Sequence, residues 1–170
     1  MSLWFGEIRD TETATIAIKA AQTGHLVLST LHTNSKQQKH SVALNKWTSL
    51  AGSIRLIIAQ RLVRTLCPHC KKEASTPIEV TINQEIVALK HWYAAGCERC
   101  YSGYYGRAAI FELLVISDAL RFAIINGEST ATIHTLAIQQ GMETLFENGY
   151  PHGHRRQTSM EEVIRVLGVF

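Results

Sequence analysis

Apolar and polar positions in the N-terminal part of the chain follow the pattern of a strand, a helix and a second strand. Residues 3–5 predict the end of a buried strand, and residues 25–31 predict another buried strand. The alanine- and isoleucine-rich stretch between them predicts a helix that Asp10 or Thr11 caps and Gly24 ends. Such a unit implies a right-handed crossover and a parallel sheet. We therefore expect an α/β fold.

Farther along the chain the pattern favours helices. Apolar residues at helical spacing over residues 50–66, including Ile54, Ile58 and Leu62, predict one helix. Residues 108–115 form a short apolar segment. Start and stop signals then predict three helices, at residues 118–126, 130–140 and 159–167. We expect the apolar residues of this C-terminal region to form a core rather than a cofactor site.

Composition narrows the class of protein without selecting a function. The 170 residues are 46% hydrophobic, which is ordinary for a globular protein and excludes gross disorder. The formal net charge of +3 is too small to indicate nucleic-acid binding by itself. No apolar run reaches the roughly 18 residues that span a bilayer, and the N-terminus has no signal-peptide pattern, so we expect a cytosolic protein.

The four cysteines form two pairs, Cys67 with Cys70 and Cys97 with Cys100, and two residues separate the members of each pair. One tight turn can present both sulfurs of such a pair to a tetrahedral ion, and two turns complete a closed four-sulfur zinc shell. The alternatives are free structural thiols, or disulfides in a secreted chain. Because we expect a cytosolic chain, and no cysteine is left over, we predict a structural Zn²⁺ site that needs neither of the two nearby histidines.

Polar residues follow the two predicted N-terminal strands. Glu7 and Asp10 come directly after the first strand, and His32 follows the second. Open α/β sheets bind their ligands at the carboxyl ends of the strands, so we expect all three side chains near a ligand-binding rim. Residues 1–34 therefore predict part of a nucleotide-hydrolysing site.

Several short motifs occur in a fixed order along the chain, at residues 6–14, 23–34, 59–64, 66–68, 103–107 and 110–113, together with both cysteine pairs. In this order they resemble the C-terminal part of the type II secretion and type IV pilus assembly ATPases, most closely the pilus-assembly branch. The resemblance implies a partial RecA-like P-loop NTPase core with a parallel sheet, a four-cysteine zinc subdomain and a C-terminal helical region. These parts would span residues 1–66, 67–107 and 108–170.

The resemblance assigns chemistry to the acidic residues and histidines. Glu7 would end the Walker B strand, activate the water that attacks the γ-phosphate of ATP and help to hold Mg²⁺. His32 would be a catalytic sensor near the γ-phosphate, and His25 would complete the histidine box. Asp10 would be associated with the nucleotide through the same motif. From the residues alone, Glu7 could instead cap a helix or pair with Arg9, and His25 could be a structural histidine.

The resemblance also implies roles for three arginines. Arg61, Arg64 and Arg107 would face the nucleotide or a neighbouring subunit of a ring. On the helix expected over residues 50–66, a solvated basic face would explain the first two nearly as well. The sequence leaves this choice open.

The sequence departs from the family pattern at three places. No Gly-x-x-x-x-Gly-Lys-Ser/Thr motif occurs, so the phosphate-binding half of the site is missing from these 170 residues. Residues 35–53 and 151–156 fit the pattern poorly, as in a truncated or degenerate chain. A parallel sheet without its central strands exposes apolar faces and an open edge. We therefore expect poor stability or aggregation, and no ATPase activity of this chain alone.

The leading hypothesis is an ATPase motor subunit that powers type IV pilus assembly or type II secretion, between which the motifs do not choose. By resemblance it would work in a hexameric ring, peripheral at the cytoplasmic face of the inner membrane. Its partners would be the inner-membrane platform protein and a cytoplasmic adaptor. The alternative is an inactive zinc-containing remnant that only binds proteins. A zinc-ribbon nucleic-acid binder is disfavoured, because few aromatic residues lie beside a basic patch in the cysteine loops.

Overall fold

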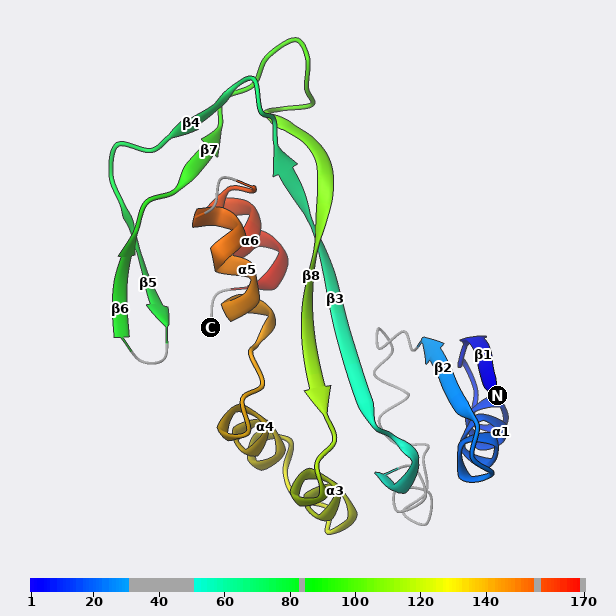
Figure 1. The fold of residues 1–170 in the computed structure, drawn as a ribbon. Coiled ribbons are helices and arrows are strands. Elements are labelled where there is room, and N and C mark those ends of the chain that lie inside the picture. The colour runs from blue at the N-terminus through cyan, green and yellow to red at the C-terminus, as the bar shows by residue number, and fades with distance from the viewer. Residues whose placement is uncertain (31–50, 83–84, 155–156, 169–170) are drawn as a thin grey trace. The chain divides into compact units, whose positions relative to one another are not determined.

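A computed structural model of the protein describes residues 1–30, 51–82, 85–154 and 157–168. The chain divides into two compact units, which are described separately. The N-terminal unit comprises Met1–Leu56 and Val115–Ala137, and the cysteine-bearing unit comprises Ile57–Leu114 and Ile138–Phe170. The described residues form both strands and helices, beginning with a strand–helix–strand unit (Figure 1), which confirms the α/β class. None of the described helices is long and apolar enough to cross a membrane.

The N-terminal unit begins with the predicted strand, helix and strand. Strand β1 (Ser2–Glu7) and strand β2 (Leu26–Thr30) pair in parallel, and helix α1 (Thr11–Gln22) connects them. The N-cap of α1 is Asp10, whose side chain accepts a hydrogen bond from the backbone N–H of Thr13 at 2.7 Å. The three elements and the cap at Asp10 are therefore confirmed.

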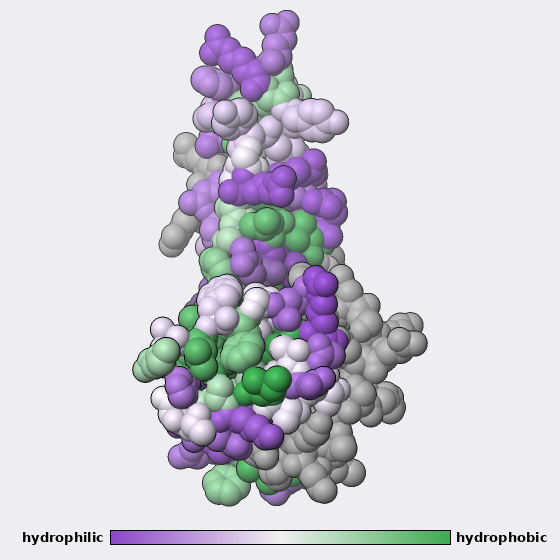
Figure 2. All heavy atoms as spheres, turned by 90° about the vertical axis from the view of Figure 1, so that its right-hand side faces the viewer, coloured by the Kyte–Doolittle hydropathy of each residue, from purple (hydrophilic) through white to green (hydrophobic). Residues whose placement is uncertain are grey.

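The small sheet of β1 and β2 exposes one apolar face. Trp4 lies opposite Leu28 in the pairing, and Leu26 lies two residues before Leu28, so the three side chains share a face. Their exposed fractions are 72% for Trp4, 62% for Leu26 and 47% for Leu28. Figure 2 shows hydrophobic side chains at the surface of this part of the chain. The prediction that both strands are buried is wrong for this chain, whereas the predicted exposed apolar face is confirmed.

Two helices that follow the last strand, β8 (Tyr104–Val115), begin in the N-terminal unit. They are α3 (Asp118–Ile125) and α4 (Thr130–Gln139), and both agree with the predicted helices to within one residue at each end. The side chain of Ser117 caps α3 by accepting a hydrogen bond from the N–H of Leu120 at 3.2 Å. Leu120 is buried, as expected for a core position.

Two long strands organise the cysteine-bearing unit. Strand β3 (Leu56–Leu66) and strand β8 (Tyr104–Val115) pair with each other and run in opposite directions (Figure 1). The helix predicted over residues 50–66 is therefore wrong at residues 56–66. Leucine, isoleucine and valine are so frequent there that a helical period and a two-residue period both fit the sequence. The available partner strand decides between them, because strand preference depends on packing against neighbours.

Two short antiparallel strand pairs extend from the long strands (Figure 1). Strand β4 (Lys71–Glu73) pairs antiparallel with β7 (Trp92–Ala94). Strand β5 (Ile78–Ile82) pairs antiparallel with β6 (Glu85–Leu89). The chain between the two cysteine pairs thus has its own structure.

Helices α5 (Leu145–His154) and α6 (Met160–Leu167) pack together beside β3 and β8 (Figure 1). The predicted helix over residues 159–167 is confirmed by α6. The side chains at the centre of this core are each no more than 4% exposed: Val63, Leu66, Ile110, Met160 and Val163. A Cβ atom at Gly149 would lie 2.5 Å from Cδ1 of Leu167, so a larger residue there would require the Leu167 side chain to shift.

Residues 151–156 fit the family pattern poorly. Residues 151–154 nevertheless continue α5, with Pro151 inside the helix. Residues 155–156 lie outside the described part of the chain. Of residues 35–53, which also fit the family pattern poorly, residues 35–50 lie outside it as well.

Candidate metal centre and nucleotide-site residues

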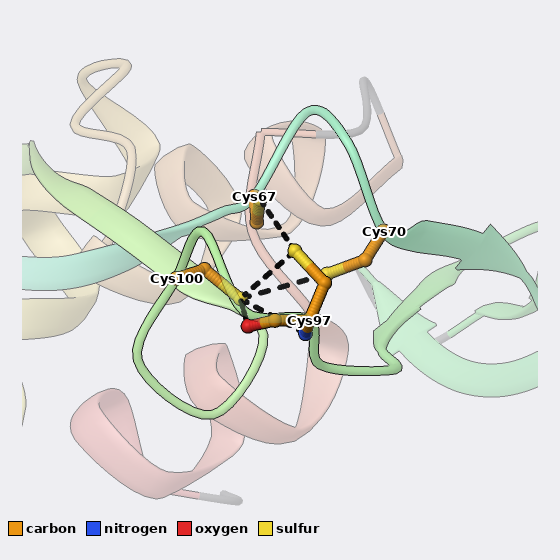
Figure 3. Close-up of side chains that lie close together, drawn as sticks. All are labelled: Cys67, Cys70, Cys97 and Cys100. Carbon is orange, nitrogen blue, oxygen red and sulfur yellow. Dashed lines mark hydrogen bonds between the residues drawn. The ribbon is translucent and has the colours of Figure 1, made fainter.

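The four cysteines meet at one point of the cysteine-bearing unit. Cys67 and Cys70 come from the turn between β3 and β4, and Cys97 and Cys100 come from the loop between β7 and β8 (Figure 3). All four Sγ atoms lie within 4.8 Å of one another. The Sγ–Sγ distance is 4.0 Å between Cys67 and Cys97, 3.7 Å between Cys70 and Cys100, and 3.6 Å between Cys97 and Cys100. The predicted convergence of the two pairs is confirmed.

These distances fit a tetrahedral metal site. Zinc–thiolate bonds of about 2.3 Å in a tetrahedron place the sulfurs about 3.8 Å apart. The backbone N–H of Cys97 donates a hydrogen bond to Sγ of Cys100 at 3.3 Å, which supports a thiolate there. Although burial acts to raise the pKa of the Cys100 thiol, this N–H and the neighbouring thiol lower that pKa to about 7. Four sulfurs leave no open coordination position, so an ion held here has a structural role.

A tight turn sets the position of the second cysteine pair. Ser102 and Gly103 have positive φ angles of 50° and 85°, and Tyr101 and Tyr104 flank them as a two-residue hairpin. The carbonyl oxygen of Gly103 accepts a hydrogen bond from the N–H of Cys67 at 2.9 Å. Gly103 therefore connects the two halves of the cysteine cluster.

Glu7 and Asp10 lie at the carboxyl end of β1, as predicted. Glu7 is the last residue of β1 and lies opposite Thr30 of β2. One carboxylate oxygen of Glu7, Oε2, accepts a hydrogen bond from Nε of Arg9 at 2.6 Å. Asp10 accepts hydrogen bonds from the backbone N–H and the hydroxyl of Thr13, and the backbone hydrogen bond is the main reason why the pKa of Asp10 is below its usual value. The carboxylate of Asp10 is thus used by the helix cap.

His25 lies at the opposite end of the strands from Glu7. It immediately precedes β2, whose first residue pairs with the first residue of β1. Its Nδ1 atom lies 3.2 Å from the hydroxyl of Thr23 and 3.3 Å from the carbonyl oxygen of Ala20. These contacts hold the ring against the end of α1. His32 lies outside the described residues.

The three predicted arginines all lie on the two long strands. Arg61 and Arg64 belong to β3 rather than to a helix, and Arg107 belongs to β8. Arg61 and Arg107 are exposed, and Nη1 of Arg61 donates a hydrogen bond to the carbonyl oxygen of Gln60 at 3.0 Å. Arg64 differs from both, because its Nη2 atom lies 2.7 Å from Oε2 of the buried Glu162.

The sequence reasoning missed the role of Glu162. Its side chain is fully buried on α6, where a carboxylate is rare unless it is paired. Two arginines bind it, Arg64 from β3 and Arg165 from the same helix. The sequence around Glu162 did not indicate that this residue is buried, because its partner Arg64 lies 98 residues away in the sequence.

The sequence matches the family model described as type II/IV secretion system protein over residues 3–165. It is 50% identical over 173 residues to a protein transport protein HofB homolog of Escherichia coli K12, covering 98% of this chain and 37% of that protein. It is 44% identical over 169 residues to the type IV pilus assembly ATPase PilB of Pseudomonas aeruginosa, covering 95% and 30%. For type II secretion system protein E of Aeromonas hydrophila the identity is 40% over 171 residues, covering 95% and 33%. The chain thus spans about a third of the length of these curated relatives.

Solved structures show the same kind of fold. The pilus retraction motor PilT with bound ADP aligns with a TM-score of 0.62 and 21% sequence identity, over 96% of this chain and 38% of PilT. The Legionella pneumophila ATPase DotB aligns with a TM-score of 0.61 and 21% identity, over 95% of this chain and 37% of DotB. At this identity the likeness concerns the fold alone, and it confirms a partial RecA-like fold.

Proposed function

We propose that the chain is the carboxyl-terminal part of an ATPase motor that drives type IV pilus assembly or type II secretion. The chain belongs to the type II/IV secretion system protein family. The observation that carries the proposal is the family match over residues 3–165. It includes Glu7 at the carboxyl end of a parallel strand and the four clustered cysteines. Relatives named for both processes match nearly the whole chain, so their names do not choose between the two.

In this proposal the chain supplies one side of an ATP site. Glu7 accepts a proton from the water that attacks the γ-phosphate, and His32 senses that phosphate. When bound, Mg²⁺ neutralises charge on the phosphates. The phosphate-binding loop has to come from residues beyond these 170, because the sequence contains no such motif.

The remaining predicted nucleotide residues contribute less directly. Asp10 holds the start of α1 beside Glu7, and His25 supports the opposite end of the sheet. Arg61 and Arg107 are exposed and are available to a neighbouring subunit of a ring. Arg64 is already paired with Glu162, so we assign it to the internal structure of the subunit.

The four cysteines hold a structural zinc ion in this proposal. The ion fixes the end of β3 to the start of β8, and the strand pairs β4–β7 and β5–β6 extend from that point. We propose that this region engages an inner-membrane platform protein and a cytoplasmic adaptor. The motor would then lie peripherally at the cytoplasmic face of the inner membrane.

A chimera tests the motor function directly. Residues 1–170 replace the matching segment of PilB of Pseudomonas aeruginosa, to which they are 44% identical. We expect the chimera to hydrolyse ATP with Mg²⁺, and we expect Glu7→Gln to lower turnover about 100-fold or more. The matched control is Glu12→Gln, which makes the same change at an exposed residue in the first turn of α1.

The result also decides between the motor and the inactive remnant. A chimera that assembles and binds zinc but does not hydrolyse ATP would support a remnant that only binds proteins. Hydrolysis that survives Glu7→Gln would overturn the assignment of the catalytic base.

A further inference from the structure

Both strands that lead into the cysteine cluster are held by the same helix. Arg64 lies three residues before Cys67 at the end of β3, and Tyr104 lies four residues after Cys100 at the start of β8. Each of the two makes a direct contact with α6 or with its cap residue. Helix α6 and its cap residue therefore contact both chain segments that lie next to the cysteines.

The contact to β3 is a buried ion pair. The carboxylate of Glu162 accepts hydrogen bonds from the backbone N–H of Arg64 at 3.1 Å and from its Nη2 at 2.7 Å. Arg165 donates two more hydrogen bonds to Glu162, from Nε at 2.8 Å and from Nη2 at 2.7 Å. The carboxylate of Glu162 has no solvent exposure, and undocking of α6 would break its hydrogen bonds from β3. These bonds therefore stabilise the docked position of α6.

The contact to β8 is a pair of hydroxyl groups. The phenol oxygen of Tyr104 lies 2.7 Å from Oγ of Ser159, the N-cap residue of α6. The guanidinium of Arg64 lies over the ring of Tyr104, 4.0 Å from its centroid. Because one arginine touches both Glu162 and Tyr104, the two strands and the helix form a single cluster.

Backbone contacts tighten the connection next to the first cysteine. The hydroxyl of Thr158 donates a hydrogen bond to the carbonyl oxygen of Arg64 at 2.6 Å. The N–H of Leu66 donates another to the carbonyl oxygen of Gln157 at 2.8 Å. Leu66 directly precedes Cys67 in the chain. The segment before α6 therefore restrains the residue next to a proposed metal ligand.

We propose that metal binding at the four cysteines and docking of α6 are energetically coupled, so that each stabilises the other. A metal ion fixes Cys67 relative to Cys100, and this fixes the spacing at which Arg64 and Tyr104 meet α6. A docked α6 conversely holds the cysteines close to their bound positions, which lowers the ordering cost of binding. The C-terminal helix thus responds to occupancy of the metal centre. This inference rests on the metal centre proposed above.

The coupling acts equally in both directions, as any linkage between two equilibria does. We therefore expect that weakening the helix contacts lowers zinc affinity by about tenfold, within the range typical of coupled sites. We expect by the same reasoning that zinc slows opening of residues 157–167 by about the same factor.

The first experiment measures zinc affinity of the full 170-residue chain by competition with a chromogenic chelator. Tyr104→Phe removes one hydroxyl and Glu162→Gln removes one charge, and neither touches a cysteine. Tyr105→Phe and Glu161→Gln are the matched controls, because these neighbouring side chains are exposed. We expect about tenfold weaker binding in the two test variants and no more than twofold in the controls. Equal affinities in test and control variants would overturn the coupling while leaving the metal centre intact.

The second experiment follows hydrogen exchange with and without zinc in the parent chain, where no variant has to fold. We expect zinc to slow exchange across residues 157–167 about tenfold and to leave α4 unchanged as an internal reference. Unchanged exchange at residues 157–167 with a fully loaded site would contradict the coupling. A parent chain that binds no zinc would overturn the metal centre and the coupling together.

Discussion

The guanidinium of Arg9 lies against the carboxylate of Glu7: its Nε donates a hydrogen bond of 2.6 Å to Oε2, and its Nη2 lies 2.5 Å from the same oxygen. The arginine side chain is 78% exposed and the glutamate side chain 23%. Exposed ion pairs of this kind contribute about 1 kcal/mol or less. The ion pair with Arg9 therefore contributes little to holding Glu7 in place.

The roles of Glu7 and Arg9 in ATP hydrolysis can be separated by experiment. In the PilB chimera we expect Arg9→Gln to lower Mg²⁺-dependent ATP hydrolysis by no more than about threefold, because only a weak exposed pair is lost. Steady-state turnover is measured beside Glu7→Gln, for which the expected loss is about 100-fold or more. A loss of similar size in both variants would mean that Arg9 itself acts on the nucleotide.

Metal content is predicted from the cysteine geometry. We expect one zinc ion per chain by elemental analysis of the purified protein, because the four sulfurs fit one tetrahedral ion. Cys67→Ser should lose most of that zinc, since a serine hydroxyl is a poor ligand for a structural zinc site. His69→Ala, which removes an exposed neighbour from the same turn, should keep it. Retention of a full equivalent by Cys67→Ser would contradict the four-sulfur site.

Stability should depend on the ionisation of Glu162. Burial acts to raise the pKa of this carboxyl, but hydrogen bonds from Arg165 and Arg64 outweigh it and lower the pKa from 4.5 to about 2. A lowered pKa stabilises the fold above pH 4.5, and that contribution is lost as the pH falls from about 4.5 through about 2. Its size is on the order of 3 kcal/mol.

Urea unfolding in dilute solution, followed by tryptophan fluorescence, checks this prediction. The stability difference between the parent chain and Glu162→Gln should shrink as the pH falls from 5 towards 2. Glu161→Gln serves as the control, because Glu161 is exposed on the same helix turn. All variants are measured with excess chelator, because Glu162→Gln is also expected to weaken zinc binding and loss of metal would not cancel between variants. A difference that does not vary with pH would contradict the lowered pKa.

The hydrophobic pattern predicted local elements well and long-range partners poorly. The cap at Asp10 and the crossover from β1 to β2 follow from neighbouring residues, so the sequence alone was sufficient. The cysteine cluster was predictable because each Cys-x-x-Cys pair is itself local. The strand β3 was not, since its pairing with β8 joins segments about 40 residues apart and the leucine-rich run fits two periods.

Arg64 shows the same limit at the level of a single side chain. By resemblance it was a candidate for contact with the nucleotide or a neighbouring subunit, and its sequence neighbours offered a solvated basic face as the alternative. Its partner Glu162 lies 98 residues away on α6. Burial of that partner is a property of the packed fold, so no local pattern could reveal it.

The turn at Gly103 is predicted to tolerate no side chain. Its φ of +85° disfavours any residue other than glycine, and an added Cβ would lie 2.8 Å from Cα of Ala94. Gly103→Ala should therefore lower stability by about 2 kcal/mol or more and weaken zinc binding, because the turn carries the bond to Cys67. Gly127→Ala is the comparison, since its φ of +70° is also positive but its Cβ would meet no atom within 4 Å. Equal effects of the two changes would show that backbone strain alone is responsible.

The exposed apolar face of β1 and β2 predicts how the isolated chain behaves. Trp4, Leu26 and Leu28 lie together on one face of a two-stranded sheet, whereas parallel sheets in α/β proteins are normally covered on both faces. Leaving this surface in water costs about 25 cal/mol for each Å², so association of chains through it is favourable. We expect the 170-residue chain to form concentration-dependent oligomers or aggregates in size-exclusion chromatography with light scattering.

Charged substitutions on that face provide the decisive comparison. Trp4→Lys combined with Leu26→Lys should shift the chain towards the monomer, because association would bury unpaired charge. Changing Lys19→Gln and Glu12→Gln on the exposed surface of α1 should leave association unchanged. If the unmodified chain elutes as a monomer at every concentration and unfolds cooperatively, the face is stable in water and the self-association prediction is wrong. If only the lysine variant is monomeric, the same face is the surface through which the isolated chain associates, because no other change separates the two proteins.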